Sequence, residues 1–212
     1  MIYRNIIKID NFLTDDKISL INKELLKLDP LLEDENHTGH DSNYNKLSVA
    51  SFTRVYMDDF YDTDRTKSDI LKIFQSQIFS QSVYDKIPKF ELLLKLIPSS
   101  NHHECQYTVY NKGGEFKWHV DSNSTPKAHR LANFIYYLND DFEGGKLELS
   151  FRTDIDSALT DHVCDLSVDL VVTPKKNTLV IMPSDMWHRV KPVTKGKRRT
   201  VNGHIGFLTE SS

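Results

Sequence analysis

Apolar residues recur at helical spacing in two segments of the first hundred residues. In residues 14–28 they fall three or four positions apart, at Ile18, Ile21, Leu25 and Leu28. Residues 68–83 repeat the pattern with Ile70, Ile73, Phe74 and Ile78. Each pattern predicts an amphipathic helix, and Thr14 is a candidate cap for the first. Residues 33–45 are polar, so we expect a loop between the two helices.

From residue 106 onward, short apolar runs alternate with turn residues, as in an antiparallel β fold. The runs predict eight strands, at 106–110, 116–120, 131–138, 146–151, 169–173, 178–182, 188–190 and 198–207. Eight short strands are typical of a double-sheet jelly roll, the double-stranded β-helix. We therefore expect an α+β fold in which N-terminal helices pack on one sheet of the jelly roll. The expected organisation is one domain over 1–212, with a helix-rich support region (1–104) and a jelly-roll core (105–208).

The composition is typical of a soluble globular protein. Apolar residues make up 39% of the chain, enough for a core, and charged residues make up 27%. The net charge of −3 provides no basic field, so we expect no nucleic-acid partner. The chain has two cysteines, no cleavable apolar leader and no apolar run of about 18 residues. We therefore expect a cytoplasmic protein without a membrane partner.

The motif His119-Val120-Asp121 can supply two ligands to one metal ion. Residues i and i+2 of an extended strand point the same way, with Cα atoms roughly 7 Å apart. Two imidazoles and one carboxylate are the protein ligands of non-haem iron oxygenases, and the other metal positions stay open. His102-His103-Glu104 has the same spacing, and roughly one such motif is expected by chance in this composition. Taken alone, either motif is more often a surface pair or a turn.

The residues that follow each motif distinguish the two. After Asp121 come Tyr137-Leu138-Asn139, Gly144-Gly145, His188, Pro192-Val193, Gly196 and Arg198. In order and spacing, residues 105–208 resemble the prolyl 4-hydroxylase-like branch of the 2-oxoglutarate/iron(II) oxygenases, over about half the chain. The resemblance implies a jelly roll in which His119, Asp121 and His188 bind iron. The His102/Glu104 pair has no such downstream partners, so we assign it to the surface or to the surroundings of the site.

The resemblance also implies Fe(II), O2 and the cosubstrate 2-oxoglutarate, with ascorbate as a further candidate cofactor. In this branch a basic residue on the last strand, ten positions after the second histidine, binds the distal carboxylate of 2-oxoglutarate, and Arg198 has that position. Alternation along the strand gives a polar face, which suits a ligand slot, with Arg198, Thr200, Asn202 and His204. The other face is mostly apolar and would pack on the helices, with Arg199, Val201, Ile205 and Phe207. For Arg199, as for Lys195 and Lys197, we expect a solvated basic turn.

Two tyrosines are candidates for the cosubstrate slot. Tyr137 shares the predicted inward face of its strand with Asn133 and Ile135, and the matching family tyrosine donates its hydroxyl to the same carboxylate. A purely structural core position is the alternative for Tyr137. Tyr110 precedes the glycine turn and is a candidate for lining the entrance. His204 stands where related enzymes often carry tryptophan, which leaves both a packed core residue and a cosubstrate contact open.

The resemblance implies an enzyme: a dioxygenase that couples decarboxylation of 2-oxoglutarate to hydroxylation of a substrate C–H bond. Asp121 argues against a halogenase, in which an open iron position replaces the carboxylate. The branch favours a peptidyl-proline or another protein side chain as substrate, and a free amino acid or other small molecule is the alternative. An inactive cupin-like binding module is a rival of a different class. The polar segment 152–167 is long for a connection, and it is either a lid over the pocket or a surface insertion.

Overall fold

The computed structural model describes residues 6–40, 46–61, 64–84, 105–121, 128–152 and 166–208. In these ranges every helix precedes residue 85. The helices, with η marking a 3-10 helix, are α1 (Asp15–Leu28), η1 (Asp29–Leu31), α2 (Met57–Phe60), η2 (Arg65–Lys67), α3 (Asp69–Ile78) and α4 (Gln81–Tyr84). None of the helices in the described ranges has the length and apolar character needed to cross a membrane.

The two long helices confirm the helical spacing seen in the N-terminal region. Helix α1 begins after Thr14 as predicted, although the Thr14 side chain makes no capping hydrogen bond. Helix α3 begins after Ser68, whose hydroxyl accepts a backbone hydrogen bond from the first turn. The helix expected over 68–83 ends earlier, at Ile78, and α4 is a separate turn. The buried Glu24 joins α1 to α3 by accepting a hydrogen bond from the Ser68 hydroxyl at 2.6 Å.

All eight predicted strands are present, with ends shifted by no more than three residues. They are β4 (Cys105–Tyr110), β5 (Glu115–His119), β6 (Ala128–Tyr137), β8 (Leu147–Ser150), β9 (Leu170–Val172), β10 (Thr178–Pro183), β11 (Trp187–Val190) and β13 (Arg198–Leu208). The structure adds β1 (Ile7–Asp10), β2 (Glu33–His40), β3 (Lys46–Tyr56), β7 (Glu143–Gly144) and β12 (Val193–Lys195). The strands β7 and β12 form a small sheet of their own.

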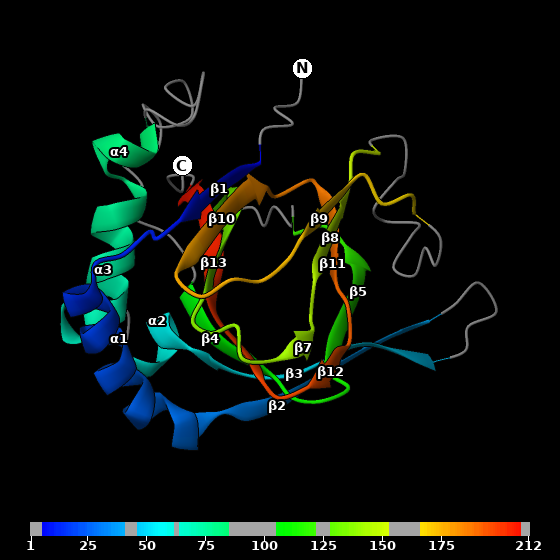
Figure 1. Ribbon diagram of the computed structural model, residues 1–212, viewed down its shortest axis with the longest axis horizontal. Helices are drawn as coiled ribbons and strands as arrows, with labels where there is room; N and C mark the ends of the chain where they lie inside the picture. The colour runs from blue at the N-terminus through cyan, green and yellow to red at the C-terminus, as the bar shows by residue number, and fades with distance from the viewer. Residues whose placement is uncertain are drawn as a thin grey trace.

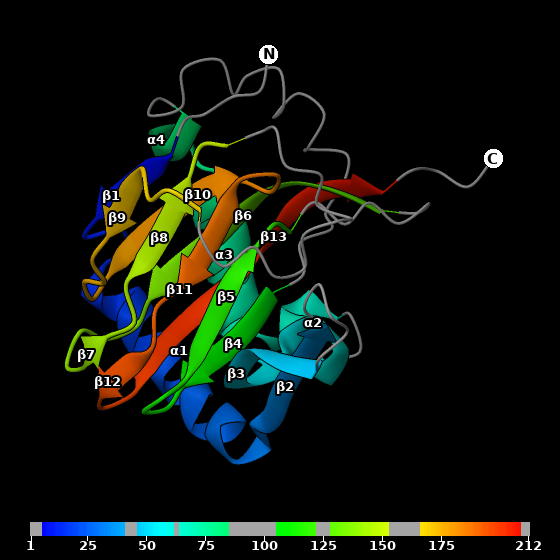
Figure 2. The ribbon, with the colours of Figure 1, turned by 90° about the vertical axis from the view of Figure 1, so that its right-hand side faces the viewer.

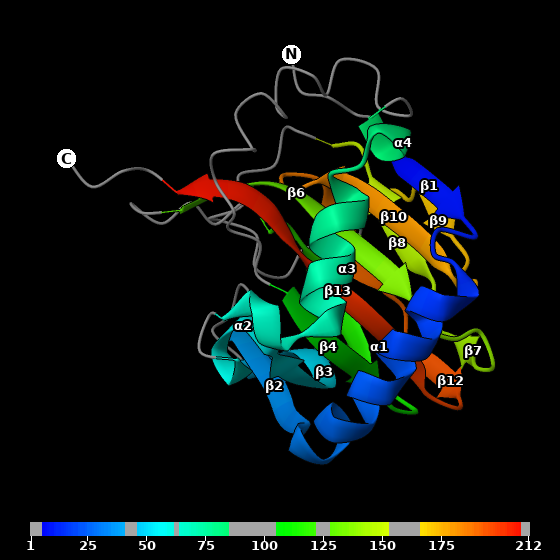
Figure 3. The ribbon, with the colours of Figure 1, turned by 90° about the vertical axis from the view of Figure 1, so that its left-hand side faces the viewer.

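The main sheet is antiparallel and curls around a central interior (Figure 1). We call β1, β10, β6, β13 and β4 the helix-side wall, because α1 and α3 cover its outer face (Figure 3). The opposite wall consists of β5, β11, β8 and β9, which lie side by side in Figure 2. Strand β3 joins the walls: residues 53–56 pair with β4, whereas Ala50 and Ser51 pair with β5. The curled double wall with helices on one side confirms the expected jelly-roll fold.

The curl divides the apolar residues into two layers. One layer fills the space between the helices and the helix-side wall, where the Phe74 ring stacks on Phe134 with centroids 5.6 Å apart. The other layer lies inside the curl and includes Ile135, Tyr137 and Leu147. Successive residues of β6 enter different layers because side chains alternate across a strand. The inner layer surrounds a cavity, and the candidate site residues line it.

The expectation of a loop over 33–45 is wrong for residues 33–40, which form β2. In the described part of the chain, β2 pairs with β3 alone, so it is an edge strand that depends on backbone hydrogen bonds. Such a strand does not need the apolar alternation by which strands are recognised in a sequence. The N-terminal region therefore contributes strands as well as helices. Residues 102–104 and 153–165, which include the His102/Glu104 pair and most of the proposed lid, lie outside the described residues.

Candidate metal centre

The structure brings His119, Asp121 and His188 together at one end of the curled sheet. Strands β5 and β11 are antiparallel neighbours, and His188 is the Cα partner of His119. Asp121 lies two residues beyond His119, just after β5 ends, and its backbone N–H donates to the carbonyl of Ser184 at 2.8 Å. This bond fixes the chain where the carboxylate turns toward the two imidazoles.

The three side chains are spaced like the ligands of a single ion. His188 Nε2 lies 3.3 Å from Asp121 Oδ2, and His119 Nε2 lies 3.7 Å from Asp121 Oδ1. All three ligand atoms fall within 4.8 Å of one another. Ligands about 2.1 Å from a metal and at right angles to each other are roughly 3 Å apart, so small movements would bring these atoms onto one ion. The donor set of two imidazoles and one carboxylate suits non-haem iron(II).

Backbone carbonyls orient both imidazoles. His119 Nδ1 lies 2.7 Å from the carbonyl oxygen of Lys117, and His188 Nδ1 lies 2.9 Å from that of Met186. A neutral imidazole that donates through Nδ1 keeps its Nε2 lone pair for a metal. The ring of Phe116 stacks on His119 with centroids 3.6 Å apart, which further restricts its rotation. Both histidines are therefore held in the orientation that a metal site requires.

Burial and mutual charge set the protonation of the cluster. Burial, assisted by the neighbouring His188, lowers the pKa of His119 to about 3, although Asp121 acts in the opposite direction. Burial raises the pKa of Asp121, but the two histidines outweigh it and hold that pKa well below its usual range. For His188, the contact with Asp121 outweighs burial and raises the pKa. Asp121 is therefore a carboxylate and His119 a neutral imidazole, the forms in which each residue binds a metal.

A cavity of about 320 Å³ extends from the metal cluster between the two walls. Arg198, Thr200, Asn202 and His204 of β13 line it, as the alternation of that strand predicts. The opposite face of β13 points to the helices, with Val201 and Ile205 in the layer beneath them. The predicted facing of the last strand is confirmed.

Arg198 is buried in this cavity without an anionic partner among the described residues. It is 1% exposed, and its guanidinium lies 4.8 Å from the ring centroid of Tyr110 and 5.1 Å from that of Tyr137. Arg198 Nε and the Tyr137 hydroxyl are buried with no hydrogen-bond partner in the described ranges. A buried cation normally has a counter-charge, so the pair fits a ligand carboxylate. Tyr110 lines the cavity, and Tyr137 lies beside Arg198; both rings belong to the inner apolar layer.

Both tyrosines remain proton donors beside Arg198. Burial raises the pKa of Tyr110 to about 12, with the positive charge of Arg198 partly opposing it. Burial likewise raises the pKa of Tyr137 against the same opposing charge. Because a neutral phenol can donate a hydrogen bond, each tyrosine could donate to a carboxylate bound at Arg198.

The Gly144-Gly145 turn is packed against the same arginine. Gly145 has φ +59°, and a Cβ added there would lie 2.9 Å from Arg198 Cδ. A residue with a side chain would therefore be strained in its backbone and would press on the arginine. Gly145 therefore leaves room for the Arg198 side chain and also adopts the positive φ that the turn requires.

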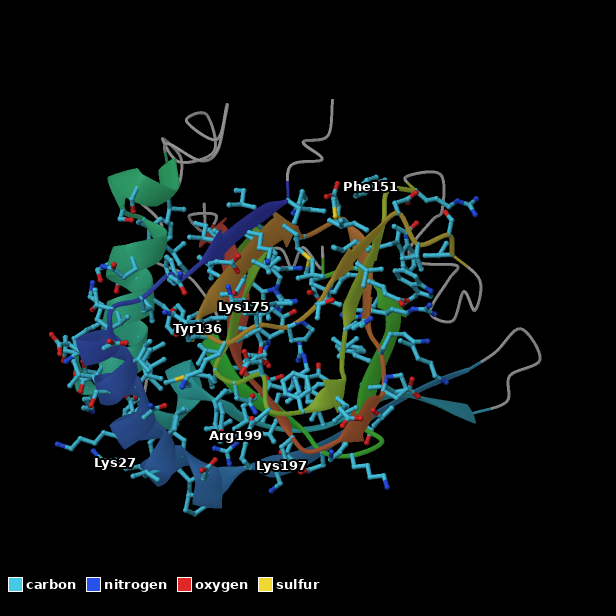
Figure 4. All side chains as sticks on the ribbon, viewed as in Figure 1. Lys27, Tyr136, Phe151, Lys175, Lys197 and Arg199 are labelled. Atoms are coloured by element: carbon cyan, nitrogen blue, oxygen red, sulfur yellow. The ribbon has the colours of Figure 1, made fainter. Side chains whose placement is uncertain are left out.

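The neighbouring Arg199 departs from the solvated turn that the sequence suggested. Its guanidinium lies 3.5 Å from the carboxylate of Asp29 in η1, on the helix side of β13 (Figure 4). Alternation places it on the opposite face of the strand from Arg198. The two adjacent arginines therefore have separate roles: Arg198 faces the cavity, and Arg199 ties β13 to the N-terminal helices.

Three features of the site were not assigned from the sequence. Asn133 Nδ2 donates to Asp121 Oδ2 at 2.8 Å, although Asn133 was expected only to face inward. Phe116 covers the His119 ring. Arg54 of β3 lines the cavity and donates to the side-chain oxygen of Gln106 at 3.2 Å. Alternation along β6 could have identified Asn133, but Arg54 lies on a strand that the pattern did not reveal.

The comparisons with known proteins agree with this geometry. Residues 105–206 match the model of the 2OG-Fe(II) oxygenase superfamily. No curated protein was found to match the sequence. A Pseudomonas putida prolyl-4-hydroxylase structure aligns at 18% identity and TM-score 0.58, covering 98% of this chain and 94% of that one.

Two further structures have the same fold. A Trichoplax adhaerens prolyl hydroxylase, solved with a hypoxia inducible factor peptide fragment, aligns at 18% identity and TM-score 0.62, covering 96% of this chain and 84% of that one. An oxidoreductase of the 2OG-Fe(II) oxygenase family from Burkholderia pseudomallei aligns at 13% identity and TM-score 0.57, covering 94% and 84%. Residues 105–206 therefore match the 2-oxoglutarate/Fe(II) oxygenases, a superfamily of enzymes, and the chain has the fold of the prolyl 4-hydroxylases.

Proposed function

We propose that this protein is a 2-oxoglutarate- and Fe(II)-dependent dioxygenase that hydroxylates a C–H bond of a peptidyl-proline or another protein side chain. One observation carries the proposal: a single cavity contains the His119, Asp121 and His188 cluster and also the buried Arg198, which has no anionic partner among the described residues. The cluster suits a metal ion, and the arginine suits the carboxylate of a ligand that also reaches the metal. A dicarboxylate 2-oxo acid satisfies both sites at once.

Each of these residues has a role in the proposal. His119, Asp121 and His188 hold Fe(II), and Arg198 binds the distal carboxylate of 2-oxoglutarate. The Tyr137 hydroxyl donates to the same carboxylate, and Tyr110 packs over the guanidinium and closes that end of the slot. When bound, Fe(II) with 2-oxoglutarate and O2 supplies the oxidation that releases succinate and carbon dioxide and hydroxylates the substrate. The protein positions these groups and keeps water from the buried end of the cavity.

Two observations favour a protein side chain over a free small molecule as substrate. The cavity volume is at the low end of the roughly 300–1,000 Å³ typical of ligand sites, so bound 2-oxoglutarate leaves little space for a second whole molecule. The Trichoplax enzyme with the same fold was solved with a peptide. Both support a substrate that inserts one side chain and leaves its backbone outside.

Succinate formation provides the first test. Purified protein with Fe(II) and 2-oxoglutarate should convert 2-oxoglutarate to succinate, and a protein extract should stimulate the conversion more than a metabolite pool. Mass spectrometry of the extract should then find peptides heavier by one oxygen atom. If only metabolites gain oxygen, the substrate is a small molecule. If 2-oxoglutarate binds but no succinate forms in either mixture, the protein is a binding module.

A further inference from the structure

Two buried polar residues of the helix-side wall form a hydrogen-bonded chain that ends on Asp121. Asn133 Nδ2 donates to Asp121 Oδ2 at 2.8 Å, and His204 Nδ1 lies 2.8 Å from Asn133 Oδ1. Strand register produces the contact, because His204 of β13 is the Cα partner of Asn133 of β6. Asn133 is 3% exposed and His204 is 9% exposed, and both line the cavity.

The direction of each hydrogen bond follows from the chemistry of the groups. A carboxylate only accepts hydrogen bonds, so Asn133 must present its NH2 group to Asp121. The amide oxygen of Asn133 then faces His204, which must donate through its Nδ1–H. Without a donor at position 204, the buried amide oxygen would lose this hydrogen bond, and the amide could turn over. His204 therefore determines which end of the Asn133 amide reaches the carboxylate.

We propose that Asn133 and His204 are positioning residues that fix the orientation of the Asp121 carboxylate, so that it offers the metal a single oxygen. Asn133 donates to Oδ2, which lies 3.3 Å from His188 Nε2, while Oδ1 lies 3.7 Å from His119 Nε2 and accepts no hydrogen bond from the described part of the chain. The hydrogen bond from Asn133 restrains the rotation of the carboxylate. A carboxylate that bound through both oxygens would take a position that 2-oxoglutarate or O2 needs. The inference rests on the proposed function, because it requires a metal at the three-residue cluster.

Co(II) binding tests the inference without turnover, with calorimetry measuring affinity and visible absorption reporting coordination number. Asn133→Leu removes the donor at similar size, and Asn133→Ala does the same if leucine does not fit. Each should weaken Co(II) binding about 10–100-fold, as expected for a residue that orients a metal ligand. The visible bands of bound Co(II) should also lose intensity, since Asp121 is then free to bind through both oxygens and a higher coordination number weakens these bands.

His204 provides the matched pair of variants. His204→Leu should weaken Co(II) binding in the same direction, whereas His204→Gln retains an N–H donor and should restore most of the affinity. In the Asn133→Leu background, His204→Leu should cause no further loss, because its effect passes through Asn133. Additive losses of affinity, or a lower unfolding temperature with unchanged Co(II) affinity and spectrum, would show that both residues only pack.

Failure of the proposed function would give a different result. In that case wild-type protein binds no Co(II), or binds it equally well after His119→Ala. If wild-type binding depends on His119 but is insensitive to Asn133→Leu and His204→Leu, the positioning inference alone is overturned.

Discussion

The guanidinium of Arg198 lies 5.1 Å from the ring centroid of Tyr137, and each of the two side chains holds a buried polar atom without a partner among the described residues. Burying an unpaired cation and a phenol side by side is costly unless a third group satisfies both. This pair therefore marks the place in the cavity where a carboxylate gains the most binding free energy.

Replacing Arg198 should affect the cosubstrate far more than the fold. In Arg198→Ala, a buried carboxylate loses its charged partner, worth on the order of 2–5 kcal/mol, so the KM for 2-oxoglutarate should rise strongly. Arg199→Ala is the matched control on the other face of β13, and its KM should stay near the wild-type value. Initial rates of succinate formation at varied 2-oxoglutarate measure both. The reverse ranking would assign the cosubstrate carboxylate to Arg199 and refute the role proposed for Arg198.

Tyr137→Phe separates cosubstrate binding from core packing. Removing the hydroxyl keeps the ring and takes away a hydrogen bond to a charged group, worth about 1.5–3 kcal/mol. The KM for 2-oxoglutarate should rise, but less than in Arg198→Ala, and the unfolding temperature should not fall, because the hydroxyl has no partner among the described residues. An unchanged KM would assign Tyr137 to the core alone.

Gly145→Ala should weaken 2-oxoglutarate binding although it removes no charged or hydrogen-bonding side chain. The new Cβ would lie 2.9 Å from Arg198 Cδ, and the positive φ adds strain of roughly 1–2 kcal/mol. Gly113→Ala is the control, since Gly113 has φ +86° but nothing within 4 Å of an added Cβ. Both variants should lose stability in denaturant unfolding. A rise in the 2-oxoglutarate KM should appear in Gly145→Ala only, and equal KM values in both would exclude contact with Arg198.

Loss of a metal ligand should abolish turnover and leave the chain folded. His119→Ala and Asp121→Ala each remove one of three protein ligands, so succinate formation should disappear while circular dichroism retains the wild-type spectrum. His102→Ala tests the competing motif and should keep most activity. Wild-type rates in either ligand variant would refute the metal assignment.

Metal binding should also stabilise the protein. At a Mn(II) concentration about 100 times its Kd, mass action gives about 2.7 kcal/mol, which raises the Tm of a chain of this size by roughly 5–10 °C. His188→Ala should show no comparable rise, and a chelator should reverse the rise in the wild type. An equal increase in Tm for both proteins would place the metal elsewhere.

The jelly-roll strands were predictable because each carries its own signal. In β13, alternation assigns Arg198 to the cavity and Val201 to the helix side, and the structure agrees. Strand β2 carries no such signal, since its pairing with β3 uses backbone groups. Strand β3 is covered on both sides, with Phe52 in the inner layer and Val55 in the layer under the helices, so apolar residues do not mark a single face.

The link between Asn133 and His204 could not have been predicted in the same way. The two residues are 71 positions apart, and their contact depends on how β6 and β13 are registered against each other. A local pattern indicates which face a side chain takes, but not which residue of another strand lies opposite. The three proposed iron ligands were identifiable only because their order along the chain resembles a known family.

Strand β3 lies where the two walls of the curled sheet meet. In the order of the main sheet it is the strand that pairs with both walls, whereas β1 and β9 end the order and do not pair with each other. His119 and His188 lie on the opposite wall, and Arg198 lies on the helix-side wall. A molecule that binds a metal at His119 and His188 with one end and Arg198 with the other end would link the two walls. The cosubstrate would thus hold the two walls together as well as react, and the angle between the walls would depend on whether it is bound.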